Sequence, residues 1–468
     1  MKTMQIIMGC IFPLLLFTSC ENWFDVSPKS ELKGDDLFKE ASGARDALIG
    51  CYGLMAGEEL YGAQLTMTYV DVLGQYYASA NVAQNAFQNA FTYKYSEPTE
   101  DARKDAIWKR TYNVVANINS LLQRIEGKSK IFPTGEFELI KGEALGLRAY
   151  LHLDLLRLFG ASPAMKEGLV QPAIPYVDRY TKELFPLLTV EEILERILID
   201  LTESRKLLSE VDPFGPKSSN YDLDNLSGIW KGREFRMNYY AATALMARTL
   251  LYRNGDSDRS KAYECALEVI NSMLFPLITG EQISGNDQNG FVQENVFALE
   301  KRGLKENVID NYFYTSNQSS TYLAMNKSTI TRVFPVTLDI DYRMRWWIEQ
   351  SGNIYLLAKY NHAERIPLLK VSEMYLIAAE SASQLIDGEY YFNKLLYHRG
   401  LPEEKLEAKK LQSRILAEYA KEFIGEGQLF FAYKRMGNGL RPIFNTSLSN
   451  AELVYKLPLP TQNTHFTH

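Results

Sequence analysis

The sequence is poor in cysteine and histidine, with four cysteines and five histidines among 468 residues. Two cysteines lie at or before residue 20, so only Cys51 and Cys265 could pair in the remainder. A single possible pair in a chain of this length is not a disulfide framework. Both cysteines lie among apolar residues with helical spacing, and we expect buried thiols rather than a disulfide.

Recognised catalytic motifs are also absent. The sequence contains no His-Glu-x-x-His, Gly-x-Ser-x-Gly, Gly-x-x-x-x-Gly-Lys or Cys-x-x-Cys segment. His152 lies close to Asp154 within a helical pattern and is expected to be a structural histidine. Carboxylates are plentiful, but nothing marks a pair placed for glycoside hydrolysis. The sequence therefore predicts no enzyme, no cofactor and no metal site.

Positive charge is not in excess. The 51 Lys and Arg residues stand against 57 Asp and Glu residues, which gives a formal net charge of −6. Nucleic-acid binding needs clustered positive charge, so no nucleic-acid partner is expected. Aromatic residues, in contrast, make up 12% of the chain and include 29 tyrosines. A tyrosine ring suits either a protein core or the binding of polar ligands such as sugars.

Long apolar runs are absent after residue 20, so no membrane-spanning helix is expected there. Before it, Lys2 precedes a mostly apolar run from Met4 to Thr18. This run is shorter than the roughly 20 residues that cross a bilayer, and it suits a secretory signal. Small residues then precede Cys20, as at a lipoprotein cleavage site. We expect residues 1–19 to be a signal peptide and Cys20 to carry the lipid anchor.

Helical periodicity dominates the rest of the chain. Helix boundaries are indicated by Gly160, by Asn254-Gly255 and by a capping box of Thr189 and Glu192. The predicted fold is mainly all-α, with tetratricopeptide-like stacked helix pairs, long loop insertions and little β structure. Helices are expected over residues 38–55, 108–127, 137–160, 189–210, 237–253, 259–272, 371–385 and 412–424.

Two long insertions, at residues 60–100 and 280–360, are rich in aromatic and amide side chains. Tyrosine rings can stack on the apolar faces of sugars while amides bond the hydroxyls, and loops on a rigid scaffold commonly carry function. The same rings would equally suit a hydrophobic core, and Trp346 and Trp347 are expected to be structural. The candidate ligand-binding residues are Tyr76, Tyr77, Asn81, Tyr312 and Tyr314.

Five segments, in this order, resemble the SusD/RagB family of nutrient-binding outer-membrane lipoproteins, and the resemblance covers nearly the whole chain. They are Cys20 with Trp23-Phe24-Asp25-Val26-Ser27-Pro28, then Gly142-Glu143-Ala144-Leu145-Gly146-Leu147-Arg148-Ala149 with Ile174-Pro175, then Arg236–Ala242, Pro367–Glu380 and Glu422–Phe431. The fourth segment is the most specific. Lys370 within it stands where the family usually has arginine.

The resemblance implies a single SusD-like domain over residues 20–468. Such a domain would lie on the cell outer membrane, held by its lipid, as a lid on a TonB-dependent transporter of SusC type. It would hold a glycan, or in some branches a peptide, where lid and barrel meet. The motifs also place charged residues on apolar helix faces, where they need partners and are expected to fix helix packing. These residues are Arg148, Glu373, Glu380 and Glu426.

Two other functions remain open from the sequence. The chain could act chiefly as a gating or interaction subunit of the transporter, with another protein supplying ligand specificity. It could also be a lipid-anchored hydrolase, although no residue pattern points to catalysis. The leading prediction is surface capture of a nutrient, with a glycan as the expected ligand.

Overall fold

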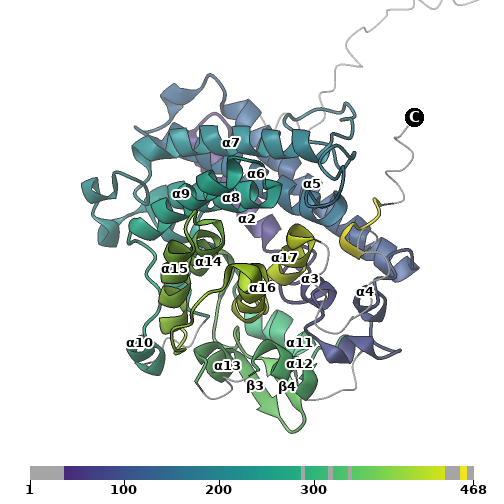
Figure 1. Cartoon of the computed structure of the whole chain (residues 1–468). Helices are drawn as coiled ribbons and strands as arrows, with labels where there is room; N and C mark the ends of the chain where they lie inside the picture. The colour runs from purple at the N-terminus through teal and green to yellow at the C-terminus, as the bar shows by residue number, and fades with distance from the viewer. Residues whose placement is uncertain (1–35, 286–289, 315–319, 336–339, 438–453, 461–468) are drawn as a thin grey trace, which may run out of the picture.

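The computed structural model describes residues 36–285, 290–314, 320–335, 340–437 and 454–460. Within these residues the chain is mostly helical, with two small β-sheets (Figure 1). The predicted fold class, mainly all-α with little β structure, is confirmed. The predicted signal peptide and its lipidated cysteine lie outside the described residues.

Long helices form the body of the molecule, and they pack as pairs. Helix α6 lies against α7, α8 against α9, and α14 against α15, while α7 also contacts α8 and α9 contacts α14. Pairs that stack in this way give the predicted tetratricopeptide-like arrangement (Figure 1). The long helices are α2 (Ala41–Met55), α5 (Pro98–Ile125), α6 (Glu136–Phe159), α7 (Val190–Val211), α8 (Tyr239–Arg253), α9 (Asp258–Asn271), α14 (Val371–Ser381), α15 (Leu385–Tyr397), α16 (Leu411–Glu422) and α17 (Gln428–Met436).

The helix boundaries follow local sequence signals. Thr189 and Glu192 form the predicted capping box at the start of α7, with each side chain bonded to the other residue's backbone amide. Gly160 is the C-cap of α6. Asn254 ends α8 in the left-handed conformation, which asparagine tolerates better than most residues. These three predicted boundaries are confirmed.

The insertion at 280–360 forms a small mixed region rather than a single loop. Strand β1 (Asn295–Glu300) pairs antiparallel with β5 (Arg365–Lys370), and β4 (Ile354–Leu357) lies between β2 (Met325–Asn326) and β3 (Ile348–Ser351). Figure 1 places β3 and β4 beside the helices of this region, away from the helical body. Its short helices are α10 (Gly280–Gly285), α11 (Asp310–Tyr312), α12 (Lys327–Val333) and α13 (Tyr342–Trp347), with the π-helical turn η8 (Lys305–Ile309).

The core contains the two predicted thiols and the predicted structural tryptophan. Cys51 and Cys265 are free and buried, and burial raises the pKa of both thiols, to about 12 and about 11 respectively. Trp347 is 0% exposed and stacks its ring under the Lys359 ammonium at 3.8 Å. Both expectations are confirmed.

The charged motif residues that are buried in the core are paired. The Arg148 guanidinium donates to both carboxylate oxygens of Asp200 at 2.7 Å, and the other charged motif residues have comparable partners. Removing one partner of a buried pair leaves the other charge unpaired, which costs about 3–5 kcal/mol. These residues therefore fix helix packing, as the sequence predicts. The pairs are Arg148 with Asp200, Arg248 with Glu373, Arg435 with Glu380, and both Lys359 and Lys370 with Glu426.

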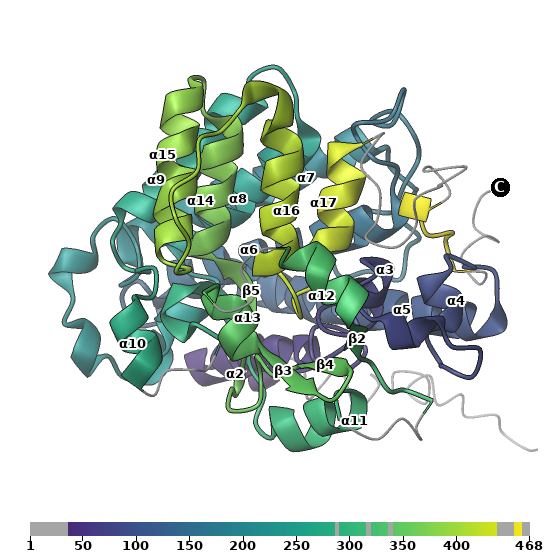
Figure 2. The same cartoon turned by 60° about the horizontal axis from the view of Figure 1, so that its bottom comes forward.

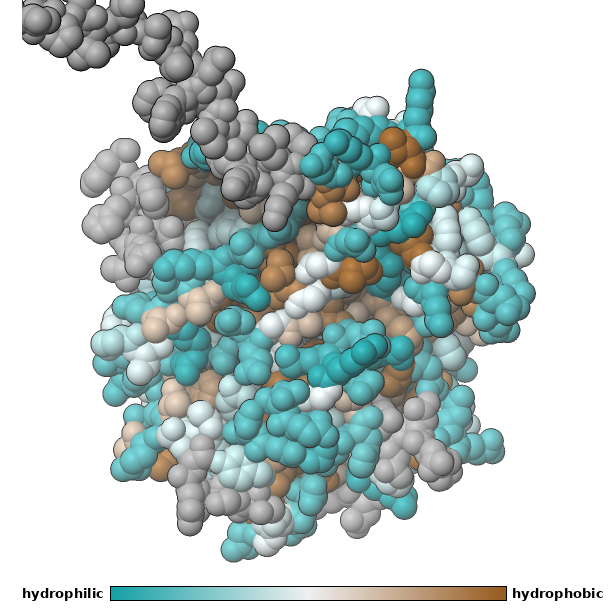
Figure 3. Space-filling view, turned by 180° about the vertical axis from the view of Figure 1, so that it is seen from behind, coloured by the Kyte–Doolittle hydropathy of each residue, from teal (hydrophilic) through white to brown (hydrophobic). Residues whose placement is uncertain are grey.

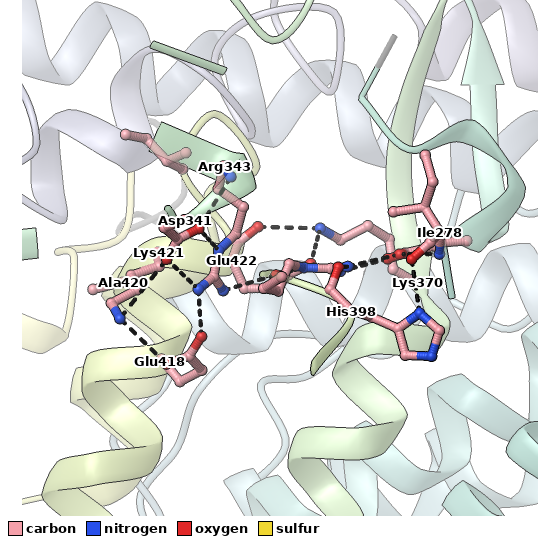
Figure 4. A network of polar contacts seen from close by, with 12 residues as sticks. Ile278, Asp341, Arg343, Lys370, His398, Glu418, Ala420, Lys421 and Glu422 are labelled. Carbon is pink, nitrogen blue, oxygen red and sulfur yellow. Dashed lines mark hydrogen bonds and ion pairs between the residues drawn. The ribbon is translucent and has the colours of Figure 1, made fainter. Parts of the chain in front are cut away.

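One buried network joins the C-terminal helices to the 280–360 region. Glu422, at the end of α16, accepts hydrogen bonds from Arg399 at 2.8 Å, from Lys370 at 3.0 Å and from Arg343 at 3.1 Å (Figure 4). All four side chains are 0–1% exposed. A single carboxylate thus holds three cations that come from three different parts of the chain.

His152 is the structural histidine that the sequence predicts. It is 0% exposed, its Nε2 accepts a hydrogen bond from the Val177 amide at 3.0 Å, and Nδ1 lies 2.9 Å from the Arg148 carbonyl oxygen. The ring therefore carries its proton on Nδ1 and is neutral. Burial lowers the pKa of His152 to about 3.

The depressed pKa of His152 predicts a pH dependence of stability. Below pH 6.5 the unfolded chain binds a proton at this position and the folded chain does not, so stability falls as the pH falls. We expect a loss of about 1 kcal/mol from this residue between pH 6 and pH 5. Urea unfolding measures the free energy of unfolding at both pH values. The decrease from pH 6 to pH 5 should be smaller in His152→Gln and unchanged in His362→Gln, a control at an exposed position. An equal decrease in the two variants would contradict the assignment of His152 as a buried, neutral histidine.

Candidate functional site

The two aromatic insertions lie against each other in the structure (Figure 2). The Ser79 amide donates to the Ala324 carbonyl at 3.2 Å, and the Ala324 amide donates to Ser79 Oγ at 2.7 Å across 245 residues of sequence. Asn85 Nδ2 donates to the Tyr322 carbonyl at 2.8 Å. The short helix η1 (Ala78–Asn81) is thereby joined to the segment that leads into β2. The structure brings the two predicted binding regions together.

Three of the five candidate binding residues, Asn81, Tyr312 and Tyr314, belong to the two insertions that meet here and keep exposed surface, and we call these three side chains the junction surface. Asn81 is exposed at the end of η1, and the two tyrosines are half-buried. The Tyr312 ring packs edge-on against Phe87 at 6.1 Å, and the Tyr314 ring against Tyr322 at 5.8 Å. Each ring is supported on one side, with part of its surface left open.

The other two candidates, Tyr76 and Tyr77, are core residues, and the structure corrects the expectation that they face a ligand. Both are 0% exposed. Tyr76 donates its hydroxyl hydrogen to the Ala420 carbonyl at 2.7 Å, and Tyr77 donates to Asp71 Oδ2 at 3.2 Å. Because both hydroxyls have internal partners, the rings can be buried without leaving a polar group unsatisfied. Tyr77 supports the junction surface from below, with its ring 5.4 Å from that of Phe313.

Asp71 connects this support to the C-terminal helices. Its carboxylate accepts hydrogen bonds from the amides of Gly425 at 2.6 Å and Gly427 at 2.9 Å, as well as from Tyr77. Burial raises the pKa of Asp71 to about 8, against the lowering effect of the two glycine amides. The side chain is 1% exposed and belongs to α3 (Tyr69–Leu73). It ties the first insertion to the turn before α17.

The charged neighbours of Tyr312 are of both signs. Burial raises the pKa of the Tyr312 hydroxyl, and Glu58 raises it further while Arg103 lowers it. The Arg103 guanidinium lies 4.6 Å from the Phe87 ring and donates to the Ala86 carbonyl at 3.2 Å. The junction surface thus combines aromatic faces, an amide and charged groups of both signs nearby.

Among the described residues, no cluster of three His, Cys, Asp or Glu side chains is placed to hold a metal ion. No helix in the described part of the chain has the length and apolar character needed to span a membrane.

Figure 3 shows one face of the molecule, the side opposite to that of Figure 1. Hydrophilic residues predominate on it, and apolar residues are interspersed among them. Large continuous apolar patches are typical of membrane or permanent protein interfaces. This face does not present one.

A cavity elsewhere on the molecule was not predicted from the sequence. It lies between α2, the segment at residues 228–236 and the paired strands β1 and β5, and its volume is about 550 Å³. Lys231, Arg236 and Arg365 contribute positive charge to it. Lys231 and Arg236 are five positions apart, but Arg365 lies 129 positions after Arg236, so no local pattern could have grouped all three. Only Arg236 belongs to a segment that the sequence singled out.

Comparison with known proteins gives a family match. The model of a family described as "starch-binding associating with outer membrane" matches residues 22–251. Two curated relatives come from Formosa agariphila. SusD-like protein P25 is 24% identical over 220 residues, which is 46% of this chain and 39% of the relative. SusD-like protein P38 is 22% identical over 257 residues, 54% of this chain and 46% of the relative. Each match spans less than half of the relative's length.

Solved structures share the fold over most of the chain. A SusD superfamily protein from Bacteroides thetaiotaomicron superposes with a TM-score of 0.70 at 21% identity, covering 91% of this chain and 98% of that one. A SusD superfamily protein from Bacteroides vulgatus superposes with a TM-score of 0.69 at 21% identity, covering 92% of this chain and 97% of that one. A SusD-like carbohydrate binding protein from the same species superposes with a TM-score of 0.62 at 18% identity, covering 85% of this chain and 83% of that one. The solved structures show the shared fold, and the matching family model with the two SusD-like relatives shows that the chain belongs to the SusD-like family.

Proposed function

We propose that this chain is a non-catalytic lipoprotein of the outer-membrane surface that captures a glycan and delivers it to a TonB-dependent transporter of SusC type. The observation that supports the proposal is the junction surface, where the segment that contains Asn81 meets the insertion that contains Tyr312 and Tyr314. The family description, starch-binding and associating with the outer membrane, supports the same ligand class and location. A peptide remains a second possible ligand.

The junction surface has the side-chain types that glycan binding requires. Tyr312 and Tyr314 would stack on the apolar faces of sugar rings, and Asn81 would bond hydroxyl groups. Because Phe87 and Tyr322 already hold the two rings, little side-chain freedom would be lost on binding. Preorganised aromatic side chains of this kind often supply much of the binding free energy at an interface.

Anchoring and delivery form the second half of the proposal. Lipidation at Cys20 would hold the domain at the membrane, since acyl chains contribute about 0.8 kcal/mol per buried methylene. The transporter would then receive the ligand from the junction surface. Labelling of the full-length protein with a radioactive fatty acid tests the anchor directly, and Cys20→Ala should abolish the label.

Replacing Tyr312 and Tyr314 together with alanine should weaken glycan binding by about 10-fold or more, because truncating a central aromatic contact typically costs over 1 kcal/mol. Calorimetry with a panel of oligosaccharides and peptides measures this on protein that starts after residue 20. The matched control is Tyr390→Ala with Tyr397→Ala, two tyrosines on α15 that are 56% and 73% exposed. The control pair should bind like the unaltered protein.

Two outcomes would redirect the proposal. Unchanged affinity in the Tyr312/Tyr314 variant would place the ligand elsewhere on the molecule. Failure of the folded, unaltered protein to bind any member of the panel would favour the gating role, in which the chain contributes to transport without a ligand site of its own. Deletion of the gene should abolish uptake under either role.

A further inference from the structure

The cavity beside α2 contains an unusual concentration of cations for an acidic protein. Four basic side chains line it, Arg45, Lys231, Arg236 and Arg365, against one carboxylate, Glu300. The whole chain has a formal net charge of −6. The cavity is therefore locally positive in its lining, and its volume of about 550 Å³ lies within the range of roughly 300–1,000 Å³ that is usual for small-molecule sites.

Two of the four basic side chains pair with carboxylates of the protein, and two do not. Arg45 donates to Glu136 at 2.6 Å through Nη2, and Arg236 Nε donates to Glu143 at 2.7 Å. Arg236 Nη2 has no hydrogen-bond partner in the part of the chain that the structure describes. Among those described residues, Lys231 forms no ion pair.

Arg365 is likewise without an ion pair in the described ranges, although Glu300 is its cross-strand neighbour in the β1–β5 register. Its guanidinium lies instead 3.6 Å from the centre of the Phe235 ring. A cation held on an aromatic face keeps its charge while its hydrogen-bond donors stay available to a ligand. Lys231 and Arg365 are thus the cations that an incoming anion could pair with.

Aromatic rings form the apolar part of the lining. Tyr52 is held by a hydrogen bond from its hydroxyl to Glu143 and accepts one from the Met237 amide at 3.0 Å. Phe235 is covered on one face by Arg365. Rings fixed beside free cations suit a ligand that has both apolar C–H faces and anionic substituents. A saccharide that carries carboxylate or sulfate groups has this combination.

We infer that the cavity lined by Tyr52, Lys231, Phe235 and Arg365 binds an acidic saccharide unit, through its carboxylate or sulfate group, at a site separate from the junction surface. This inference takes from the proposed function only that the ligand is a saccharide. It adds a ligand class, anionic rather than neutral glycans, and a second point of contact on the chain. A long acidic glycan could then be held at two places at once, which raises its overall affinity.

The glycines of α2 allow the cavity to be filled without disturbing the fold. Gly53 lines the cavity, and a Cβ atom added to it would meet nothing within 4 Å. Gly50 lies on the same helix, is equally open, and is not part of the lining. Phenylalanine is a better helix former than glycine. Gly53→Phe should therefore block the site, and Gly50→Phe is its matched control.

The test measures binding of trigalacturonate, a sulfated galactose disaccharide and neutral maltotriose by calorimetry. The two acidic probes distinguish a carboxylate from a sulfate preference. We expect at least one acidic probe to bind, with affinity lowered 10-fold or more in Gly53→Phe and in Lys231→Gln with Arg365→Gln. Affinity should fall with added salt, since screening weakens ion pairs. Gly50→Phe and Lys409→Gln, at an exposed lysine, should leave the affinity unchanged.

The outcomes separate this inference from the proposed function. Acidic probes that bind the Tyr312/Tyr314 variant but not Gly53→Phe would establish the second site. Equal binding by Gly53→Phe and Gly50→Phe, or loss of acidic binding only in the junction variant, would overturn the cavity as a site and leave glycan capture intact. Binding of maltotriose but of neither acidic probe would also overturn it. Failure of all three probes and of the wider glycan panel would instead count against glycan capture itself.

Discussion

Replacement of Glu422 with glutamine is expected to lower the free energy of unfolding by about 3–5 kcal/mol. Glu422 is 0% exposed and accepts hydrogen bonds from Arg399, Lys370 and Arg343. Although burial raises its pKa, Arg399 and Lys370 hold the pKa of Glu422 well below the usual range, so it is ionised in the folded protein. A neutral amide of the same shape would leave the cations around it without their shared counter-charge (Figure 4).

Urea unfolding followed by tryptophan fluorescence measures this loss as a shift of the transition midpoint. The matched control is Glu407→Gln, which removes an exposed ion pair with Lys410 at 2.9 Å. An exposed pair contributes about 0–1 kcal/mol, so the control midpoint should barely move. Equal midpoints for the two variants would mean that the network is not needed for stability. Failure of Glu422→Gln alone to accumulate as folded protein would agree with the expectation.

Replacement of Asp71 with alanine is expected to cost about 3 kcal/mol or more. The change removes the acceptor of the Gly425 and Gly427 amides and of the Tyr77 hydroxyl. Each buried donor left unsatisfied costs about 1–3 kcal/mol. Both glycines have positive φ, 79° and 70°, a backbone conformation that favours glycine at these two positions. Unfolding should begin at lower urea than in the unaltered protein.

Asp71→Asn is the control that separates hydrogen bonding from charge. Burial raises the pKa of Asp71 to about 8, and asparagine, which has a similar shape and cannot ionise, tests whether the fold needs the charge. The amide oxygen can accept from one glycine amide, and we expect a loss of about half that of alanine. Circular dichroism during urea unfolding measures both variants. A loss as large in asparagine as in alanine would show that ionised Asp71 is required.

The helical scaffold was predictable because its signals are local. The capping box at Thr189, the end of α6 at Gly160 and the left-handed stop at Asn254 each depend on residues within a few positions. The apolar spacing of the long helices is local in the same sense. Strands β1 and β5 were not predicted, because their partners are about seventy residues apart and each strand is short.

The partners of the buried charges were less predictable than their existence. A charged residue such as Arg148 on an apolar helix face must have a partner if it is buried, and this much follows from the sequence. That its partner is Asp200, and that Glu422 collects cations from three segments, depends on how the helices pack. The sequence has no local signal that shows which charged residues will pair when they lie far apart along the chain.

By itself, the sequence determined the fold class, the helix boundaries at Thr189, Gly160 and Asn254, the need for buried charges to be paired, and the family. It also identified the two insertions that form the junction surface. Only the tertiary structure decided which tyrosines face outward: Tyr76 and Tyr77 are buried, and Tyr312 and Tyr314 are half-exposed. The reason is physical, since a tyrosine is stable in a core once its hydroxyl finds a partner, and those partners, Ala420 and Asp71, are supplied by the fold.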